Sequence, residues 1–476
     1  MTPPSGMSDG PQPGPLAGVL TDNPQPGTMP HGFFGHPRGL STLFFTEMWE
    51  RFSYYGMRAF LILYMVHVLG FDDRHAGSVY GTYTGSVWAA TIFGGIIADR
   101  WLGQYKSVLI GGIIIALGHF TLAFHPLPFF YGGLALIVIG TGLLKPNVSG
   151  IVGSLYETND ARRDAGFSIF YMGINLGAAI GPFIAGYLAQ EVDWHLGFAC
   201  AGVGMTLGLI QYVRGRRHLQ PAIDRLERQR REAAQAAAAA KRLRAAGGAQ
   251  AASAEPVFWG FTKVEWKRLA AMAVFFAFAA VFWGAYEQAG STLNLFGDRY
   301  TRTVILGYSF PSSWFVSVQA IFVILLAPAF AWLWMRLGKH EPSTPAKFAA
   351  GLFFIGMSFV LLLIPAYALQ ASPSIRVAPF WLIGCYFIQE LGELSLSPVG
   401  LSVFTKLAPV KIVGLMLGVW FLADAVGNKA AGYAAGFISS APLPELFGVI
   451  AGVCLGASVV AALMIKPVKG LMGGVH

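Results

Sequence analysis

The sequence predicts an all-α membrane protein with twelve transmembrane helices arranged as two six-helix bundles. Three observations lead to this prediction. Of the 476 residues, 55% are hydrophobic and only 12% are charged, and the mean hydropathy is +0.55. Soluble domains carry about a quarter charged residues, so the chain is not one of them. The apolar residues gather in segments long enough to cross a bilayer, and a charged stretch separates these segments into two sets of six.

Twelve apolar segments of about 20 residues match the thickness of a hydrocarbon core. They are centred on residues 42–69, 76–98, 105–124, 129–154, 165–189, 196–213, 268–296, 304–335, 346–369, 378–405, 412–438 and 446–465. Because lipid offers no hydrogen-bond partner to the backbone, each segment is expected to be a helix. Strands of a membrane barrel would alternate in polarity, whereas these segments are continuously apolar.

The domain organisation follows from the charged stretch between the two sets. We expect a disordered cytoplasmic tail at 1–38, an N-terminal bundle at 39–213, a basic cytoplasmic linker at 214–260, a C-terminal bundle at 261–467 and a cytoplasmic tail at 468–476. The Ala residues and alternating charges of the linker also suit a helix on the membrane surface. The linker is too polar to supply two further transmembrane helices, so the sequence predicts twelve transmembrane helices and not fourteen.

The distribution of Lys and Arg predicts the orientation. With the N-terminus in the cytoplasm, 25 of the 33 lie in cytoplasmic loops and tails, four in outside loops (Arg74, Arg299, Arg302, Arg376) and four within spans (Arg51, Arg58, Lys145, Lys429). Both termini are therefore expected to be cytoplasmic, in a protein integral to the plasma membrane. The same bias accounts for the net charge of +9, so no nucleic-acid partner is expected.

The residues that usually carry enzyme chemistry are missing from the sequence. Cys200, Cys385 and Cys454 lie far apart in apolar spans, so neither a metal site nor a disulfide framework is expected. No phosphate-binding loop and no nucleophile motif is present. We therefore expect no enzyme activity and no cofactor, with a proton gradient as the energy source if the protein is a transporter.

The first apolar segment carries charges through its middle, in "TEMWERFSYYGMRAFLILYM" at 46–65. At 100° per residue, Glu47, Arg51, Tyr54 and Arg58 fall within a band of about 60°, with Glu50 at its edge. A charge at mid-membrane costs roughly 2.5–3.5 kcal/mol, so the stripe is expected to face a partner or a water-filled cavity. An ion-pair network that only fixes helix packing is one interpretation. Proton coupling suits a neighbouring acid and base better.

The turn between the second and third segments contains "GGIIADRWLGQYKS" at 94–107. This stretch resembles the cytoplasmic loop motif of major facilitator transporters, with Asp99, Arg100, Gly103 and Lys106 at the matching positions. Its glycine permits a tight turn, and its acid and bases can form contacts that hold one conformation. The resemblance implies the major facilitator fold and leaves the substrate open.

Four further motifs resemble the proton-dependent oligopeptide transporter family. They are "EMWERFSYY" at 47–55, "GLLKPNVSG" at 142–150, "FSIFYMGINLGAAIGP" at 167–182 and "LGELSLSPVGLS" at 391–402. They occur in the family's order and, with the loop motif, span residues 47 to 402. The resemblance therefore covers nearly the whole membrane portion, and the abundance of Ala, Gly and Arg in the sequence indicates a bacterial member.

The resemblance implies roles for individual residues. Those implied for proton coupling are Glu47, Glu50, Arg51, Lys145 and Glu287. Those implied for peptide binding are Arg51, Tyr54, Tyr55, Arg58, Trp88, Lys145, Tyr171, Asn175, Gln319, Glu393, Ser397 and Trp420. In this scheme cations hold the peptide carboxylate, Glu393 holds its ammonium, and Glu287 pairs with Arg58 to close the outer side.

Some positions depart from the family pattern. Gln319 and Ala320 stand where an Asn-Pro pair is common, Trp88 stands where a Tyr is usual, and Gly81 occupies the place of a His found in animal members. Glu390 has no family match and is expected to be a packing or cavity polar group. Asp424 and Lys429 lie in one predicted helix and are expected to pair with each other, without a role in transport.

The function implied is a proton-coupled symporter that imports di- and tripeptides by alternating access, in contact with membrane lipid and functional as a monomer. Two alternatives remain open at this point. One is a carrier of another small anion or metabolite on the same fold. The other is a membrane sensor or a membrane-embedded enzyme, against which the lack of catalytic motifs argues.

Overall fold

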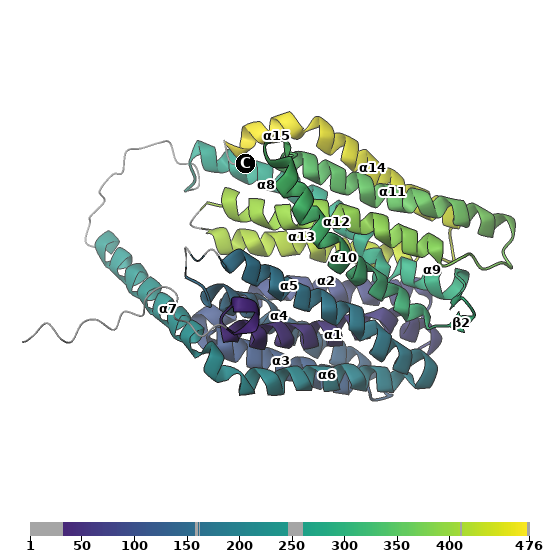
Figure 1. Cartoon of the computed structure of the whole chain (residues 1–476), viewed down its shortest axis with the longest axis horizontal. Coiled ribbons are helices and arrows are strands. Elements are labelled where there is room, and N and C mark those ends of the chain that lie inside the picture. Colours follow the sequence, from purple (N-terminus) through teal and green to yellow (C-terminus); the bar gives the residue numbers. More distant parts are fainter. Residues whose placement is uncertain (1–31, 158–159, 161, 246–259, 410–411, 474–476) are drawn as a thin grey trace, which may run out of the picture.

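The structure is a computed structural model that describes residues 32–157, 160, 162–245, 260–409 and 412–473. Figure 1 shows long helices side by side in two groups, the first from the purple-to-teal part of the chain and the second from the green-to-yellow part. A separate helix, α7 (Arg216–Ala245), leaves the first group at one end and projects away from it. We call that end of the molecule the linker end and the opposite end the far end.

The first group, or first half, is built from six long helices. They are α1 (Arg38–His67), α2 (Asp73–Ile97), α3 (Gln104–Leu122), α4 (Leu127–Ser154), α5 (Arg163–Gly181) and α6 (Trp194–Arg214), with the short turns η1 (Phe33–Gly35), η2 (Ala98–Leu102), η3 (Pro182–Gly186) and η4 (Leu188–Val192). Helix α1 packs against both α5 and α6, and most of its residues are buried. Its charged side chains therefore lie inside the protein and not against lipid.

The second half also contains six long helices. They are α8 (Lys263–Tyr286), α10 (Phe315–Leu337), α11 (Thr344–Ala371), α12 (Phe380–Leu407), α13 (Val413–Ala435) and α14 (Leu443–Leu463). The shorter elements are η5 (Glu287–Gly290), α9 (Thr292–Tyr300), the antiparallel pair β1 (Val304–Ile305) and β2 (Tyr308–Ser309), η6 (Ser312–Trp314), η7 (Gly338–His340) and α15 (Ile465–Met472).

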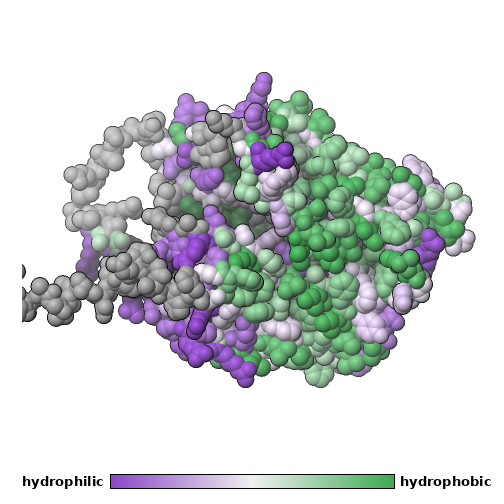
Figure 2. Space-filling view, viewed as in Figure 1, coloured by the Kyte–Doolittle hydropathy of each residue, from purple (hydrophilic) through white to green (hydrophobic). Residues whose placement is uncertain are grey.

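Thirteen of the described helices have the length needed to cross a bilayer, and twelve remain once the strongly polar α7 is set aside. Eight helical stretches, built on α3, α4, α5, α6, α8, α10, α11 and α14, are also apolar enough by composition. The other four, α1, α2, α12 and α13, are 23 to 30 residues long but more polar. In Figure 2 hydrophobic surface covers the middle of the molecule and hydrophilic surface gathers at the linker end. The predicted all-α architecture of twelve membrane helices is confirmed.

The two halves meet along two helix pairs and are closed at the far end. Helix α2 packs against α13, and α5 packs against α10. At the far end the Arg299 guanidinium of α9 donates two hydrogen bonds of 2.6 and 2.8 Å to the Asp73 carboxylate of α2. The His67 ring of α1 lies 2.8 Å from the Asp298 carboxylate. Figure 2 shows a recess between the halves at the linker end, so the molecule opens toward that end.

Two predicted spans have different boundaries in the structure. The predicted span 268–296 breaks at Tyr286, where α8 gives way to η5 and α9. The predicted span 304–335 is wrong at its start, because residues 304–309 form the β1–β2 hairpin and α10 begins at Phe315. At the hairpin tip Leu306 and Gly307 have φ angles of +52° and +86°. An α-helix cannot contain such left-handed residues, so apolar content alone misplaces its start.

The chain ends contact the bundles more than the sequence predicted. Residues 1–31, most of the expected tail 1–38, lie outside the described residues. The following residues form η1, and the His36 ring makes a 2.9 Å hydrogen bond with the Tyr156 hydroxyl. The expected tail 468–476 begins within α15, which packs against α8. Val468 and Met472 are one helical turn apart and both buried, so a short amphipathic helix forms there.

Close helix packing in the first half depends on glycines. A Cβ atom at Gly177 of α5 would lie 2.2 Å from the Met48 carbonyl oxygen of α1, and one at Gly181 would lie 2.5 Å from the Phe52 carbonyl oxygen. Both distances are far below van der Waals contact. By contrast, Gly452 of α14 has open space around the same position. The α1–α5 contact is therefore of the small-residue type that lets membrane helices approach closely.

Replacing Gly177 by Leu is expected to destabilise the fold, because the new side chain meets backbone that cannot move aside. Overpacking costs about 1–3 kcal/mol, and the clash with a carbonyl places this variant at the upper end. Thermal unfolding of the detergent-purified protein, followed by tryptophan fluorescence, measures the effect. Gly452→Leu makes the same substitution in open space and is expected to unfold like the wild type. Equal unfolding temperatures for the two variants would contradict this account of the α1–α5 contact.

Candidate functional site

The charged stripe of α1 is buried at the centre of the protein. Glu47, Glu50, Arg51 and Arg58 are each at most 5% exposed. Because an unpaired charge at this depth is costly, each of the four needs a partner of opposite charge or strong hydrogen bonds. The stripe divides into two clusters, one inside the first half and one that joins the halves.

The first cluster, called here the α1–α4 cluster, consists of Glu47, Glu50, Arg51 and Lys145. Arg51 donates from Nε and Nη2 to the two carboxylate oxygens of Glu50, the second bond being 2.5 Å long. The Lys145 ammonium of α4 donates to Oε1 of Glu47, and the Arg51 Nε lies 3.6 Å from the same oxygen. With two acids and two bases, the cluster is electrically neutral when all four groups are charged.

One oxygen of this cluster is not engaged. Oε2 of Glu47 is buried and accepts no hydrogen bond from any described residue. A buried acceptor without a donor is unfavourable, and a proton on that oxygen would turn it into a donor. The open position of the α1–α4 cluster is therefore at Glu47, whereas both carboxylate oxygens of Glu50 accept from Arg51.

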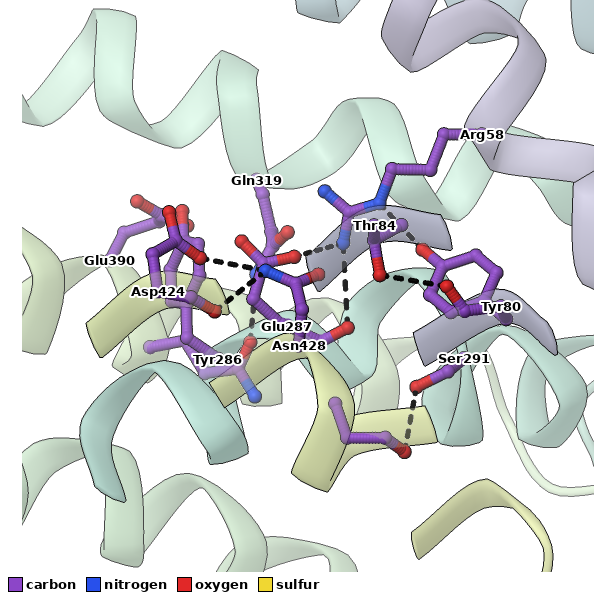
Figure 3. Close-up of polar contacts among 12 residues, drawn as sticks. Arg58, Tyr80, Thr84, Tyr286, Glu287, Ser291, Gln319, Glu390, Asp424 and Asn428 are labelled. Atoms are coloured by element: carbon purple, nitrogen blue, oxygen red, sulfur yellow. Dashed lines mark hydrogen bonds and ion pairs between the residues drawn. The ribbon is translucent and has the colours of Figure 1, made fainter. Parts of the chain in front are cut away.

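The second cluster joins the halves and is called here the gate pair, Arg58 and Glu287. Figure 3 shows Arg58 of α1 reaching across to η5, where its Nη2 donates to the carboxylate and, at 3.4 Å, to the backbone carbonyl of Glu287. Its Nε also donates to the Tyr80 hydroxyl at 2.5 Å. The Tyr55 ring lies 5.7 Å from the guanidinium carbons of both Arg51 and Arg58. Tyr55 therefore connects the two clusters through cation–π contacts.

Glu393 of α12 faces the first half from the other side. Its Oε1 accepts a 3.5 Å hydrogen bond from the Tyr171 hydroxyl of α5, the Ser397 side chain lies beside it, and Oε2 has no partner in the described chain. Asn175, one turn after Tyr171, donates to the Tyr171 carbonyl at 3.0 Å. Tyr171 is 38% exposed, so this acid lies next to open space.

A second acid on α12, Glu390, lies one turn nearer the far end. It is fully buried and accepts a 2.9 Å hydrogen bond from the Tyr286 hydroxyl of α8 (Figure 3). No described Lys or Arg lies within 4 Å of either α12 acid. The second half therefore presents acidic groups near its contact with the first half, while the cations of the two clusters, Arg51, Arg58 and Lys145, belong to α1 and α4 of the first half.

Two of the positions that depart from the family pattern, Gln319 and Trp88, take different partners. The Gln319 amide of α10 donates to Gln389 of α12 at 2.8 Å, so it is held inside the second half. The Trp88 ring of α2 stacks on Phe421 of α13, with ring centroids 5.7 Å apart and planes within 13°. Trp88 thus contributes to the contact between the halves.

Two of the aromatic residues predicted to bind the peptide are buried in this conformation. Tyr54 is 2% exposed and its hydroxyl has no hydrogen-bond partner among the described residues. Trp420 is 5% exposed and packs on Phe404 and Gly400 of α12. A Cβ atom at Gly400 would lie 2.0 Å from the indole, so Gly400 makes room for Trp420. Neither residue presents much surface to the recess.

The predicted pairing of Asp424 with Lys429 is wrong. The Asp424 carboxylate accepts a 2.7 Å hydrogen bond from Asn428, whereas the Lys429 ammonium donates to Thr82 of α2 at 2.6 Å. Residues five positions apart on an α-helix point about 140° apart, so the two side chains leave α13 on different faces. Sequence proximity within one helix is not sufficient for an ion pair.

The loop motif lies at the linker end, where η2 connects α2 to α3. Gly103 has a φ of +78°, which explains the glycine at this turn. The Asp99 carboxylate accepts a 3.0 Å hydrogen bond from Gln104, and Arg230 of α7 is close enough to act on its charge. Burial raises the pKa of Asp99, and the Arg230 charge opposes that shift. Arg100 and Lys106 are exposed and form no salt bridge with any described residue, so Arg230 of the linker helix, and neither of these bases, is the cation that acts on Asp99.

Sequence reasoning missed several contacts in the centre. Tyr80 was not predicted, although a Tyr in the polar stretch "VYGTY" of α2 could have been considered as a second partner of Arg58. Tyr286 and Gln389 were also missed, because each bonds a residue about 70 or more positions away along the chain. No local pattern identifies such partners.

Comparison with known proteins decides the family. A model of the POT family matches residues 105–449, well over half of the chain. This protein belongs to the POT family. Curated relatives of this family member include an uncharacterized transporter, YclF, of Bacillus subtilis, 41% identical over 93% of this chain and 96% of its own. The peptide transporter YePEPT of Yersinia enterocolitica is 37% identical over 92% of this chain and 96% of its own.

Solved structures agree with this assignment. A crystal structure of a POT peptide transporter in complex with alafosfalin superimposes with a TM-score of 0.81, at 39% identity, over 93% of this chain and 97% of the other. A POT family transporter in complex with 5-aminolevulinic acid gives a TM-score of 0.79, at 31% identity, over 92% and 98%. The POT family member described here is a transporter with the major facilitator fold, and it is not an enzyme.

Proposed function

We propose that this protein is a proton-coupled symporter that imports di- and tripeptides by alternating access. The observation that carries the proposal is the division of charge between the two halves of the protein. Arg51, Arg58 and Lys145 lie in the first half, and Glu393 lies in the second. A short peptide has a carboxylate at one end and an ammonium at the other, so it fits a site with opposite charges on facing walls.

The peptide would connect the two halves. Its carboxylate would lie near the cations of the α1–α4 cluster and its ammonium near Glu393, Tyr171 and Asn175. A ligand bound to both halves favours the conformation that brings them together, which is the step alternating access requires. Tyr54, Tyr55, Trp88, Gln319, Ser397 and Trp420 would shape the pocket for the peptide side chains and backbone.

Proton coupling would use the α1–α4 cluster and the gate pair. A proton on Glu47 would weaken the attraction of that acid for Lys145 and Arg51, which leaves both cations available to the peptide carboxylate. Each proton that moves inward through 100 mV contributes roughly 2.3 kcal/mol. No resident cofactor is needed for this cycle.

The orientation proposed from the Lys and Arg distribution places the linker end and both termini in the cytoplasm of the cell. The recess would then open inward, and the gate pair would close the outer side. We assign residues 39–213 and 261–467 to the two bundles, 214–260 to the cytoplasmic linker, and the protein to the plasma membrane as a monomer. Asp99, Arg100, Gly103 and Lys106 would act at the cytoplasmic face.

The names of relatives support peptides as substrates. Besides the Yersinia peptide transporter, a di-/tripeptide transporter of Lactococcus lactis is 35% identical over 93% of this chain. The structure with 5-aminolevulinic acid favours a second candidate, a carrier for other small zwitterions, since that molecule also combines an amine with a carboxylate. Both candidates use the same charge division.

Uptake of labelled dialanine by proteoliposomes, with and without an inward proton gradient, tests the proposal. We expect accumulation above equilibrium that an uncoupler abolishes, because the gradient supplies the energy. Competition distinguishes the candidates: unlabelled dipeptides should block uptake, and N-acetylated dialanine, which lacks the ammonium, should not. Failure to accumulate dialanine, in protein shown to be folded and inserted, would favour the other solutes. Transport by purified protein in empty vesicles would exclude a sensor or an enzyme.

A further inference from the structure

Asp424 is a buried acid that the proposed cycle does not yet use. It lies on α13, is 5% exposed, and accepts a 2.7 Å hydrogen bond from the side chain of Asn428, one turn along the same helix. The nearby Lys429 binds Thr82 and gives it no countercharge. An acid at this depth without its own cation is unusual and calls for a partner or a proton.

The charges that act on Asp424 come from the gate pair. Glu287 of η5 and Arg58 of α1 are the two charged groups close enough to influence it, with opposite effects. Figure 3 shows Asp424, Glu287 and Arg58 in the same polar region, with Asn428 of α13 bonded to Asp424. Two acids therefore share one cation here.

The other polar groups around α13 supply no second cation. The groups on the neighbouring elements are Tyr55 of α1, Tyr80 of α2, Tyr286 of α8 and Glu390 of α12. Tyr80 is bonded to Arg58, and Tyr286 donates to Glu390. Among the described residues, Arg58 is thus the one cation that compensates the negative charges of Glu287 and Asp424.

The cation and the two acids belong to different halves. Arg58 lies on α1 of the first half, and Glu287 and Asp424 lie in the second half. When the halves rock apart at the far end, Arg58 moves with the first half and the two acids remain together. Two neighbouring carboxylates without a cation repel each other, and a shared proton removes that repulsion.

We propose that Asp424 is a proton-coupling residue that forms, with Glu287, a carboxyl pair holding one proton whenever Arg58 leaves the gate. This inference deepens the proposed function and rests on it. The proton comes from the solution on the far side and binds a carboxylate oxygen of the pair. When the far end closes, Arg58 returns to Glu287 and the proton leaves toward the recess, so no bond other than O–H is made or broken. Opening of the gate thereby requires proton uptake.

The variant Asp424→Asn separates this role from a structural one. An Asn side chain keeps the oxygen that accepts from Asn428 and removes only the charge. The measurements are exchange of dialanine at equal pH, which needs no gradient, and the initial rate of gradient-driven uptake at a series of outside pH values. Glu445→Gln, which removes an exposed acid from the first turn of α14, is the matched control.

We expect Asp424→Asn to exchange dialanine at a rate within about threefold of the wild-type rate. Half-maximal driven uptake should need an outside pH about one unit lower than in the wild type. The reason is that a neighbouring carboxylate favours protonation of Glu287, and the variant lacks that carboxylate. Glu445→Gln should keep the wild-type profile. Exchange with an unshifted profile in Asp424→Asn would overturn the inference and leave the proposed function intact.

The remaining outcomes are also decisive. If Asp424→Asn does not exchange, Asp424→Ser provides a second removal of the charge. If Asp424→Ser exchanges dialanine and its half-maximal driven uptake moves to a lower outside pH, the inference is supported. Loss of exchange in both variants would make Asp424 a structural residue and overturn the inference. Failure of the wild type to exchange any dipeptide would instead overturn the proposed function, and the inference with it.

Discussion

Replacing Glu47 by Gln is expected to abolish accumulation of dialanine against its gradient. The carboxylate of Glu47 is the partner of the Lys145 ammonium and lies 3.6 Å from Arg51, and an amide can neither balance these charges nor bind and release a proton. Leaving a buried cation without its partner costs about 3–5 kcal/mol. The measurement is gradient-driven uptake in proteoliposomes, where we expect accumulation to fall to the level without a gradient.

A matched set of variants makes this result interpretable. Arg51→Lys keeps the positive charge but loses the two-point contact with Glu50, because a Lys cannot donate in a fork, and it should also lose driven uptake. Glu445→Gln removes an exposed acid and should transport normally. Thermal unfolding of each variant reports on folding. Normal concentrative uptake by both Glu47→Gln and Arg51→Lys would rule out the proposed coupling mechanism.

Replacing Glu393 by Gln is expected to weaken binding of dialanine by roughly 30-fold or more. Glu393 is the buried acid of α12 beside the half-exposed Tyr171, and one of its carboxylate oxygens has no hydrogen-bond partner among the described residues. Removing one partner of a buried charged hydrogen bond costs about 2–5 kcal/mol of binding free energy. Each 1.4 kcal/mol corresponds to a tenfold change in affinity. Competition against a labelled dipeptide during exchange gives the apparent affinity.

The same experiment with an acetylated peptide identifies the group that Glu393 binds. Wild-type protein should prefer dialanine strongly over N-acetylated dialanine, and Glu393→Gln should show little preference. The reason is that acetylation removes the ammonium and the substitution removes the carboxylate, so either change alone already abolishes the interaction. Glu390→Gln is the neighbouring control, because Glu390 is fully buried and bonded to Tyr286. An unchanged preference in Glu393→Gln would mean that the ammonium binds elsewhere.

The sequence by itself determined the twelve helices and the burial of the α1 stripe. A backbone in lipid must satisfy its own hydrogen bonds, so long apolar segments become helices whatever their neighbours are. Helical periodicity then places Glu47, Arg51 and Arg58 on one face, and the cost of a bare charge in lipid directs that face inward. Both arguments are local. They failed where an apolar stretch contained a left-handed turn, at Leu306 and Gly307.

Only the tertiary structure decided which charges meet. Arg58 and Glu287 are 229 residues apart, and Glu47 and Lys145 are 98 apart, so no pattern of spacing connects them, and only the family resemblance had suggested the Arg58–Glu287 pair. Local reasoning paired Asp424 with Lys429, whereas the packing of α13 against α2 and α8 turns Lys429 toward Thr82 and leaves Asp424 beside the gate pair. The physical reason is that the energy of a buried charge depends on every group around it in space, and that neighbourhood is set by helix packing rather than by sequence order.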